Sequence, residues 1–275
     1  MIHICYPCCH AESCKRYLKY SIDSVAKHNK KISITFLNSA QGNGEMEFND
    51  DDIEVYRQIL AKHGIKTPLR VFDVSLLMHK FYKCRSLKGQ WNTYKRFFIN
   101  KVYKTYMPEV NRVLYLDEDT ICTGSLEKLY NEDMKGRPYM GFIDAGVWNP
   151  KNFKLERQLC KNNKYINAGV ILIDVNYDIY PELEKLIQTA EHWHKQRIHY
   201  FHDQTIINSL CPSVFKCSMV TRNNKKEGQD YYKDIARAVL KKYNIIHYWG
   251  HKCFNRMTCT IGYPWDVIIG NIIDM

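Results

Sequence analysis

Three acidic residues follow directly on a short apolar segment in the first half of the chain. Residues 112–116 read Arg-Val-Leu-Tyr-Leu, and Asp117, Glu118 and Asp119 come next. Such a run is typical of a strand buried on both faces, and ligands of open α/β sheets bind beyond the carboxyl ends of strands. Two carboxylates directed at one point suit Mn2+ or Mg2+, which in turn bind diphosphates. A solvated acidic turn is the alternative for so short a motif.

A second apolar block carries small and amide side chains at its start. Asn167, Ala168 and Gly169 lie near the start of the segment 165–174, which is otherwise almost entirely apolar. Small residues let the backbone approach a bound molecule closely, and the Asn amide can both donate and accept hydrogen bonds. A tight strand entry in which the Gly serves packing alone is the alternative.

His247 lies at the end of a third apolar segment, residues 245–247. A lone His on an apolar strand is more often a core residue than a metal ligand. The Asp-x-Asp motif at 117–119 favours the metal-ligand interpretation instead, because two carboxylates and one imidazole complete a ligand set. The nitrogen ligand favours Mn2+ over Mg2+.

The pattern of apolar residues predicts alternating strands and helices along the chain. Residues 2–6 and 31–37 read as strands, and an apolar stripe through Leu18, Ile22 and Val25 predicts a helix over about 14–28 between them. Strand, helix and strand in this order predict an α/β fold. Further strands are expected over 69–74, 138–144 and 165–174, and further helices over about 50–62, 94–106, 148–160 and 180–194, with one more that begins at Asp203.

The bulk composition is that of a globular protein with a basic surface. The 275 residues are 45% hydrophobic and 25% charged, and the formal net charge of +11 favours anionic partners. No apolar stretch has the length of a membrane span, and the first residues do not resemble a secretory signal. We therefore expect a cytoplasmic location, with peripheral contact to the anionic inner face of the membrane as an option, and 11 reduced cysteines.

The order of these blocks resembles glycosyltransferase family 8, which contains bacterial lipopolysaccharide galactosyl- and glucosyltransferases and glycogenin. The segment VLYLDEDTICTGSLEKLY at 113–130 is most similar to the family's metal-binding block. Thr93–Phe97 resembles its Tyr-x-Arg-Leu helix start, and 167–170 its Asn-Ala-Gly-Val strand. His202–Asn208 resembles its Asp-Gln-Asp-Ile-Leu-Asn segment, and 247–250 its His-x-x-Gly block. The resemblance implies a GT-A (Rossmann-like) fold: a mixed, mostly parallel central sheet flanked by helices, in a single domain.

The resemblance also implies roles for individual residues. Asp117, Asp119 and His247 would hold Mn2+ (or Mg2+), and Gln204 and Asp203 would lie by the anomeric carbon as catalytic residues. The donor-binding residues would be Tyr6, Cys8, His10, Arg96, Asp117, Glu118, Asp119, Asp144, Asn167, Ala168, Gly169, His247, Gly250 and Lys252. Residues 1–250 would form the catalytic domain, with nucleotide-sugar binding mainly in 1–120 and the acceptor side mainly in 140–250. Residues 251–275 would pack on or near the site.

The sequence departs from the family pattern at three places. The loop after the first strand lacks the acid that usually holds uracil and instead offers Tyr6, Cys8 and His10. Tyr6 is equally well explained as a core tyrosine. Lys252 follows Gly250 by two residues where the family has three, and Thr205 replaces an acid.

The implied activity is retaining, metal-dependent transfer of galactose or glucose from a UDP-sugar to a glycan hydroxyl, as in lipopolysaccharide or cell-surface polysaccharide synthesis. The partners would then be the UDP-sugar donor and a glycan or glycolipid acceptor, and no nucleic acid is expected. Three alternatives stay open. They are a catalytically idle UDP-sugar-binding relative, a basic nucleic-acid-binding protein, and a redox protein that uses the C-x-x-C pair of Cys5 and Cys8.

Overall fold

The computed structural model describes residues 1–40, 44–79, 91–144, 165–179, 181–185, 188, 192, 202–210, 212–216, 220–222 and 243–247. Its strands are β1 (Ile2–Pro7), β2 (Ile32–Asn38), β3 (Arg70–Asp73), β4 (Arg112–Leu116), β5 (Thr120–Cys122), β6 (Tyr139–Ile143), β7 (Ile166–Asp174), β8 (Ser213–Val214), β9 (Val220–Arg222) and β10 (Ile245–His247). Its helices include α1 (Glu12–His28), α2 (Asp50–Lys62), α3 (Ser75–His79), α4 (Trp91–Tyr94), η2 (Lys95–Phe98), α5 (Ile99–Tyr106), α6 (Glu127–Tyr130) and α9 (His202–Ser209).

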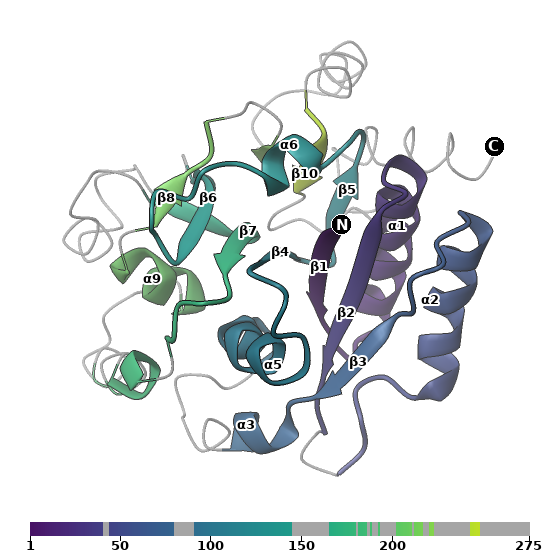
Figure 1. The fold of residues 1–275 in the computed structure, drawn as a ribbon. Coiled ribbons are helices and arrows are strands. Elements are labelled where there is room, and N and C mark those ends of the chain that lie inside the picture. The colour runs from purple at the N-terminus through teal and green to yellow at the C-terminus, as the bar shows by residue number, and fades with distance from the viewer. Residues whose placement is uncertain are drawn as a thin grey trace, which may run out of the picture.

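Seven strands form the central sheet in the order β3-β2-β1-β4-β7-β6-β8 (Figure 1). The pairs β3–β2, β2–β1, β1–β4 and β6–β8 are parallel, while β7 is antiparallel to both β4 and β6. A smaller sheet has the order β5-β10-β9. The expected mixed, mostly parallel sheet flanked by helices is confirmed.

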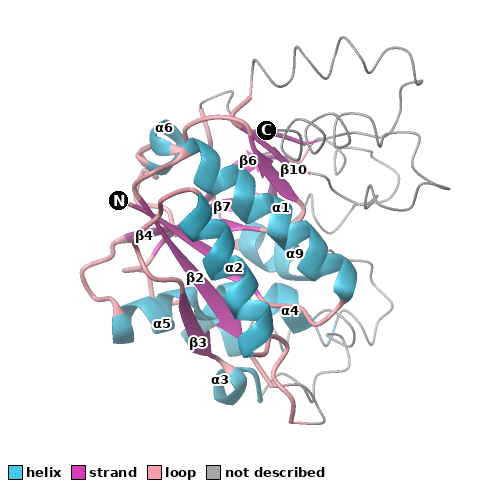
Figure 2. Cartoon of the chain, turned by 90° about the vertical axis from the view of Figure 1, so that its right-hand side faces the viewer, coloured by secondary structure: helices cyan, strands magenta, loops and turns pink. Residues whose placement is uncertain are grey.

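Side chains of the central strands alternate between two cores, one on each face of the sheet. Leu114 and Leu116 of β4 join the core formed with α1 and α2, whereas Val113 and Tyr115 join the core formed with η2, α5 and α9. Figure 2 shows α1 and α2 lying side by side over the strands, where Lys15 and Asp52 form an ion pair of 2.7 Å. Because both faces are covered, β4 reads as an unbroken apolar run.

The predicted helix ends agree with the structure at α2. Asn49 caps the helix by accepting a hydrogen bond from the backbone of Asp52, whose side chain bonds back to the cap residue. Gly64, which follows the helix, has a φ of +71°, a conformation that Gly adopts without steric cost.

The prediction of one continuous helix over 94–106 was wrong about where the helix begins and about its continuity. It begins at Trp91 and winds as a 3-10 turn from Lys95 to Phe98 before α5. The tighter turn coincides with two buried cationic side chains, Lys95 and Arg96, which donate to the Cys8 carbonyl just after β1 and to the Ala168 carbonyl on β7.

Two other expectations fall partly or wholly outside the described residues. The helix expected over 148–160 lies outside them, and of the helix over 180–194 the structure describes a helical segment at 181–185. Among the residues described, no helix combines the length and the apolar character that a bilayer span requires.

Candidate active site

Strand register brings the central acids to the start of β7. Leu116 pairs with Val170 in the antiparallel β4–β7 ladder, and the Asp117 N–H continues it by donating to the Gly169 carbonyl at 2.8 Å. The carboxyl end of β4 therefore lies beside the amino end of β7. Two blocks more than 50 residues apart in the sequence meet at this edge.

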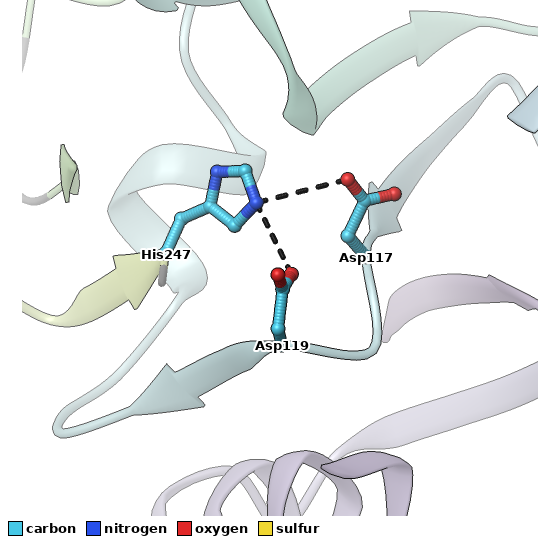
Figure 3. Close-up of side chains that lie close together, drawn as sticks. All are labelled: Asp117, Asp119 and His247. Atoms are coloured by element: carbon cyan, nitrogen blue, oxygen red, sulfur yellow. Dashed lines mark ion pairs between the residues drawn. The ribbon is translucent and has the colours of Figure 1, made fainter. Parts of the chain in front are cut away.

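The second sheet brings His247 to the same place. β5 begins directly after Asp119, and its Thr120 pairs with His247 in the antiparallel β5–β10 ladder. The imidazole is 2% exposed, with Nε2 3.1 Å from Oδ1 of Asp119 and 3.7 Å from Oδ2 of Asp117 (Figure 3). Its ring also packs edge-on against Phe142, with centroids 6.3 Å apart.

These three side chains fit a divalent ion. One ligand atom from each lies within 4.8 Å of the others, and both carboxylates remain partly exposed, Asp117 by 24% and Asp119 by 13%. No hydrogen bond reaches the buried Oδ1 of Asp119 from any residue in the described ranges. Two carboxylate oxygens and one imidazole nitrogen that converge on one point are a donor set suited to a divalent ion such as Mn2+.

Arg96 connects an acid of the candidate metal site to the start of α9. Its guanidinium lies 3.1 Å from Oδ1 of Asp117 and 3.1 Å from Oδ2 of Asp203, and it donates to the Ala168 carbonyl at 2.5 Å. The side chain is 2% exposed, so one buried cation lies between two carboxylates from different parts of the chain and offsets part of their charge. Tyr115 lies beneath it, with the ring centroid 4.3 Å from the guanidinium carbon.

A hydrogen-bonded group of amides and one carboxylate lies next to these residues. Asp144 continues β6 and is buried, and its Oδ2 accepts hydrogen bonds from Asn167 at 3.1 Å and from Gln204 at 3.2 Å. Gln204 in turn accepts from the Ala168 N–H at 3.0 Å, and Asn167 accepts from the Gly169 N–H at 2.9 Å. Both amides are therefore held at two points.

Asn208 fixes α9 against β7. The β6–β7 ladder shifts register between Gly141 and Ile143, and opposite this irregularity Ile166 bonds to a side chain. Asn208 accepts from the Ile166 N–H at 2.7 Å and donates to the Ile166 carbonyl at 2.9 Å. One amide thus satisfies both backbone groups and sets the position of Asp203 and Gln204 on the preceding turn.

Burial and charge shift three pKa values at the site. Burial raises the pKa of the Asp203 carboxyl above its ordinary value, although Arg96 opposes this shift. Burial would lower the pKa of Arg96, but Asp203, Tyr115 and Asp117 outweigh it, so the guanidinium remains charged. Burial also raises the pKa of Tyr115 well above its ordinary value, so the phenol stays protonated and donates to Asp117 at 2.8 Å.

The first loop encloses two of the side chains that were expected to contact the donor, and that donor role stays a prediction. The side chains of Tyr6 and Cys8 are fully buried, and the Tyr6 hydroxyl is hydrogen-bonded to Ser21 at 2.9 Å. As placed, neither side chain is accessible to a base, and Tyr6 is a core tyrosine. His10 is exposed just beyond the carboxyl end of β1, and Glu118 lies half-buried between the two metal-site aspartates.

The C-x-x-C pair does not have the features of a reactive dithiol. Cys5 and Cys8 are free and fully buried, and burial raises the pKa of each thiol. Reactive cysteines are partly exposed and have lowered pKa values, so these two behave as core residues.

Gly250 and Lys252 lie outside the described residues, as does the segment 251–275. Their roles stay predictions. Conversely, sequence reasoning missed Tyr115 because the pattern of β4 marks it only as a buried strand residue. It also missed Lys95, a fully buried residue that donates to the Cys8 carbonyl at 2.8 Å and forms an ion pair with Glu47.

Comparison with known proteins agrees with this arrangement. Residues 9–255 match the family model described as "Glycosyl transferase family 8". A putative glycosyltransferase of Haemophilus influenzae is 24% identical over 90% of this chain and 72% of its own length. Lipopolysaccharide 1,2-glucosyltransferase of Escherichia coli is 24% identical over 84% of this chain and 66% of its own length. The chain spans about half the length of glycosyltransferase GlyF of Streptococcus pneumoniae, at 24% identity and 52% of that protein.

Solved structures give the same fold. The galactosyltransferase LgtC, in complex with donor and acceptor sugar analogs, superposes with a TM-score of 0.72 at 19% identity, covering 100% of this chain and 96% of that one. The apo form of glycosyltransferase GlyE of Streptococcus pneumoniae has a TM-score of 0.57 at 20% identity, covering 99% of this chain and 63% of that one. The chain belongs to glycosyl transferase family 8 and has the GT-A fold.

Proposed function

We propose that this glycosyltransferase transfers a hexose from a UDP-sugar to a glycan hydroxyl with retention of anomeric configuration and in dependence on a divalent ion. The observation that carries the proposal is the convergence of Asp117, Asp119 and His247 on one point at the carboxyl end of β4. Galactose and glucose are the favoured sugars, because one relative is named a glucosyltransferase and one structural neighbour a galactosyltransferase.

The ion would be Mn2+, with Mg2+ as the second choice, held by the two carboxylates and by Nε2 of His247. Bound there, it would supply positive charge against the leaving diphosphate. The protein contributes the rigidity of the ligand set. Arg96 and Tyr115 hold Oδ1 of Asp117, which leaves Oδ2 as the oxygen nearest to His247.

The sugar would lie against the amide group formed by Asp144, Asn167 and Gln204. These side chains are already fixed by hydrogen bonds, so binding costs little further ordering. Ala168 and Gly169 bring the backbone close to the same region. Arg96 and Glu118 would complete this side of the donor site.

Asp203 and Gln204 are the residues we assign to the anomeric centre. The Asp203 carboxylate is bound by Arg96, so its charge is oriented. The acceptor hydroxyl would attack on the leaving-group face and pass its proton to the departing phosphate. That route needs no protein base and preserves configuration.

The nucleotide side of the site would include His10 and the backbone beside Tyr6 and Cys8, because their side chains are enclosed. Gly250 and Lys252 would contact the diphosphate.

We further propose that the chain divides into a donor part over 1–120, an acceptor part over 140–250 and a segment at 251–275 that packs near the site. A glycan or glycolipid acceptor at an anionic membrane surface suits the net charge of +11.

Turnover of UDP-glucose and UDP-galactose, measured as UDP release with Mn2+ and with a chelator, tests the proposal. We expect release from one of these donors that the chelator abolishes and Mn2+ restores. Binding of a UDP-sugar without any release would support instead the idle relative, for which the same site is retained. Equal release with and without the chelator would contradict the metal dependence.

A further inference from the structure

Three buried hydroxyl groups from separate elements form a row of hydrogen bonds that ends at the metal-site turn, residues 117–119. The hydroxyls of Tyr6 on β1 and Ser21 on α1 lie 2.9 Å apart, as do those of Ser21 and Thr120 on β5. Thr120 then donates to the backbone carbonyl of Asp117 at 2.9 Å. All three side chains are fully buried, so the row runs through the interior beneath α1.

The carbonyl at one end fixes the direction of every bond in this hydroxyl row. Thr120 gives its single hydroxyl proton to Asp117, so it can only accept from Ser21. Ser21 is then the acceptor for Tyr6, which is the first donor. Burial raises the pKa of the Tyr6 phenol well above its ordinary value, so the phenol keeps the proton that it donates. Each hydroxyl therefore donates once, in the direction of Asp117.

The bonding of Ser21 differs from that of an ordinary helix serine. A serine inside a helix commonly donates to a backbone carbonyl of the preceding turn. Ser24 on the same helix does so, with the Ser21 carbonyl as its acceptor at 2.7 Å. Ser21 instead links two side chains that are 15 and 99 residues away in the sequence. Because apolar residues of the same shape can replace a buried hydrogen-bonded set at little cost, stability alone does not require this row.

We propose that Thr120, Ser21 and Tyr6 are positioning residues, which hold the backbone of the metal-site turn where the ligands of the divalent ion must stand. The part of this inference that concerns the ion rests on the proposed function. The part that concerns the turn rests on the three hydrogen bonds alone.

Asp117 is then held from both faces of the central sheet. Arg96 and Tyr115 bond to its side chain from the core formed with η2, α5 and α9. The hydroxyl row bonds to its carbonyl from the face that α1 covers. Thr120 also pairs with His247 in the β5–β10 ladder. The last residue of the row therefore contacts the backbone of one proposed ligand directly and sets the strand register of another.

The first experiment measures amide hydrogen exchange residue by residue in the metal-free chain. The Asp117 N–H donates to the Gly169 carbonyl and reports on the turn, and the Cys122 N–H donates to the Ser24 hydroxyl and reports on the rest of β5. In Thr120→Val, which keeps the shape of the side chain, we expect Asp117 to exchange about fivefold faster relative to Cys122, the equivalent of one hydrogen bond. Ser21→Ala should shift this ratio in the same direction, so the test stands even if Thr120→Val fails to fold.

Two variants control this measurement. Thr120→Ser restores the hydroxyl and should return the ratio to the wild-type value. Ser24→Ala removes a buried hydroxyl from the same helix and should shift the ratio the opposite way, because it frees the Cys122 N–H. Equal acceleration of both amides in Thr120→Val and Ser21→Ala, or none, would overturn the proposal.

The second experiment is Mn2+ titration followed by electron paramagnetic resonance. We expect about tenfold weaker binding in Thr120→Val and near wild-type binding in Thr120→Ser and Ser24→Ala. The double variant Ser21→Ala/Thr120→Val should bind no more than about twofold more weakly than Thr120→Val, because Ser21 acts through Thr120. Unchanged affinity in Thr120→Val, or an equal loss in Ser24→Ala, would contradict the positioning role. A wild-type chain that bound no Mn2+ would refute the proposed function instead, and the exchange ratio would still decide whether the row holds the turn.

Discussion

The imidazole of His247 lies so close to the α-carbon of Gly169 that a methyl group on that carbon would overlap the ring. The backbone of Gly169 is not in the left-handed region, so backbone conformation does not require Gly at this position. The overlap with the ring of His247 does require a residue without a side chain. The absence of a side chain at Gly169 therefore serves both packing and the candidate site. It leaves the space that the ring of His247, the proposed metal ligand, occupies.

Gly169→Ala should displace the imidazole from the two aspartates. We expect the Mn2+ affinity to fall by about tenfold or more, as for changes that misorient a ligand, and the free energy of unfolding to fall by about 1–3 kcal/mol from overpacking. Titration calorimetry and urea unfolding measure the two effects.

Gly124→Ala is the matched control. A methyl group there would crowd Asn244, which precedes β10 by one residue, and would leave His247 untouched. This variant should lose stability without a comparable loss of Mn2+ affinity. Equal losses of affinity in both variants would show that Gly169 acts only through the general position of β10.

Tyr115→Phe should weaken the metal site while leaving the cation–π contact with Arg96 in place. The variant removes the hydrogen bond of 2.8 Å to Oδ1 of Asp117, and we expect about tenfold weaker Mn2+ binding. Tyr139→Phe provides the comparison, because the buried Tyr139 hydroxyl has no hydrogen-bond partner within the described part of the chain. It should leave Mn2+ affinity unchanged, and a similar loss in both variants would argue against a specific role for Tyr115.

Lys95→Met should be strongly destabilising. It leaves the buried Glu47 without its cation and removes the donor to the Cys8 carbonyl. Breaking a buried ion pair from one side costs about 3–5 kcal/mol, which chemical unfolding would detect. A loss below about 1 kcal/mol, the usual value for exposed pairs, would contradict the buried geometry.

The same variant should show a defined pH dependence. Burial already raises the pKa of Glu47 above its ordinary value of 4.5, with Lys95 opposing the shift, so removal of Lys95 raises it further. A carboxyl whose pKa is higher in the folded than in the unfolded state lowers stability as the pH rises through that interval. The deficit of Lys95→Met relative to wild type should therefore be smaller near pH 5 than near pH 8. A deficit independent of pH would exclude Glu47 as its cause.

The sequence predicted the strands of the site well because each is apolar on both faces and ends at a polar residue. The convergence of Asp117, Asp119 and His247 was also predicted, and their contact is found in the structure. What periodicity could not reveal is the antiparallel direction of β7, on which the contact between Gly169 and Asp117 depends.

The supporting residues were harder to predict for a different reason. Tyr115 is indistinguishable from a core residue in the pattern of β4, and Lys95 and Glu47 are 48 residues apart in the sequence. Their pairing depends on how η2 packs against the loop after β2. Local propensity contains no information on such long-range packing, and it equally failed to predict the 3-10 turn at Lys95.

The central claim is that Asp117, Asp119 and His247 bind one divalent ion, and Mn2+ titration followed by electron paramagnetic resonance tests it directly. Asp119→Asn keeps the shape of the side chain but removes its charge, and Asp51→Asn, on the exposed first turn of α2, removes the same charge elsewhere. We predict one Mn2+ site in wild type and in Asp51→Asn, with affinity at least about tenfold lower in Asp119→Asn. Unchanged Mn2+ affinity in Asp119→Asn would contradict the account.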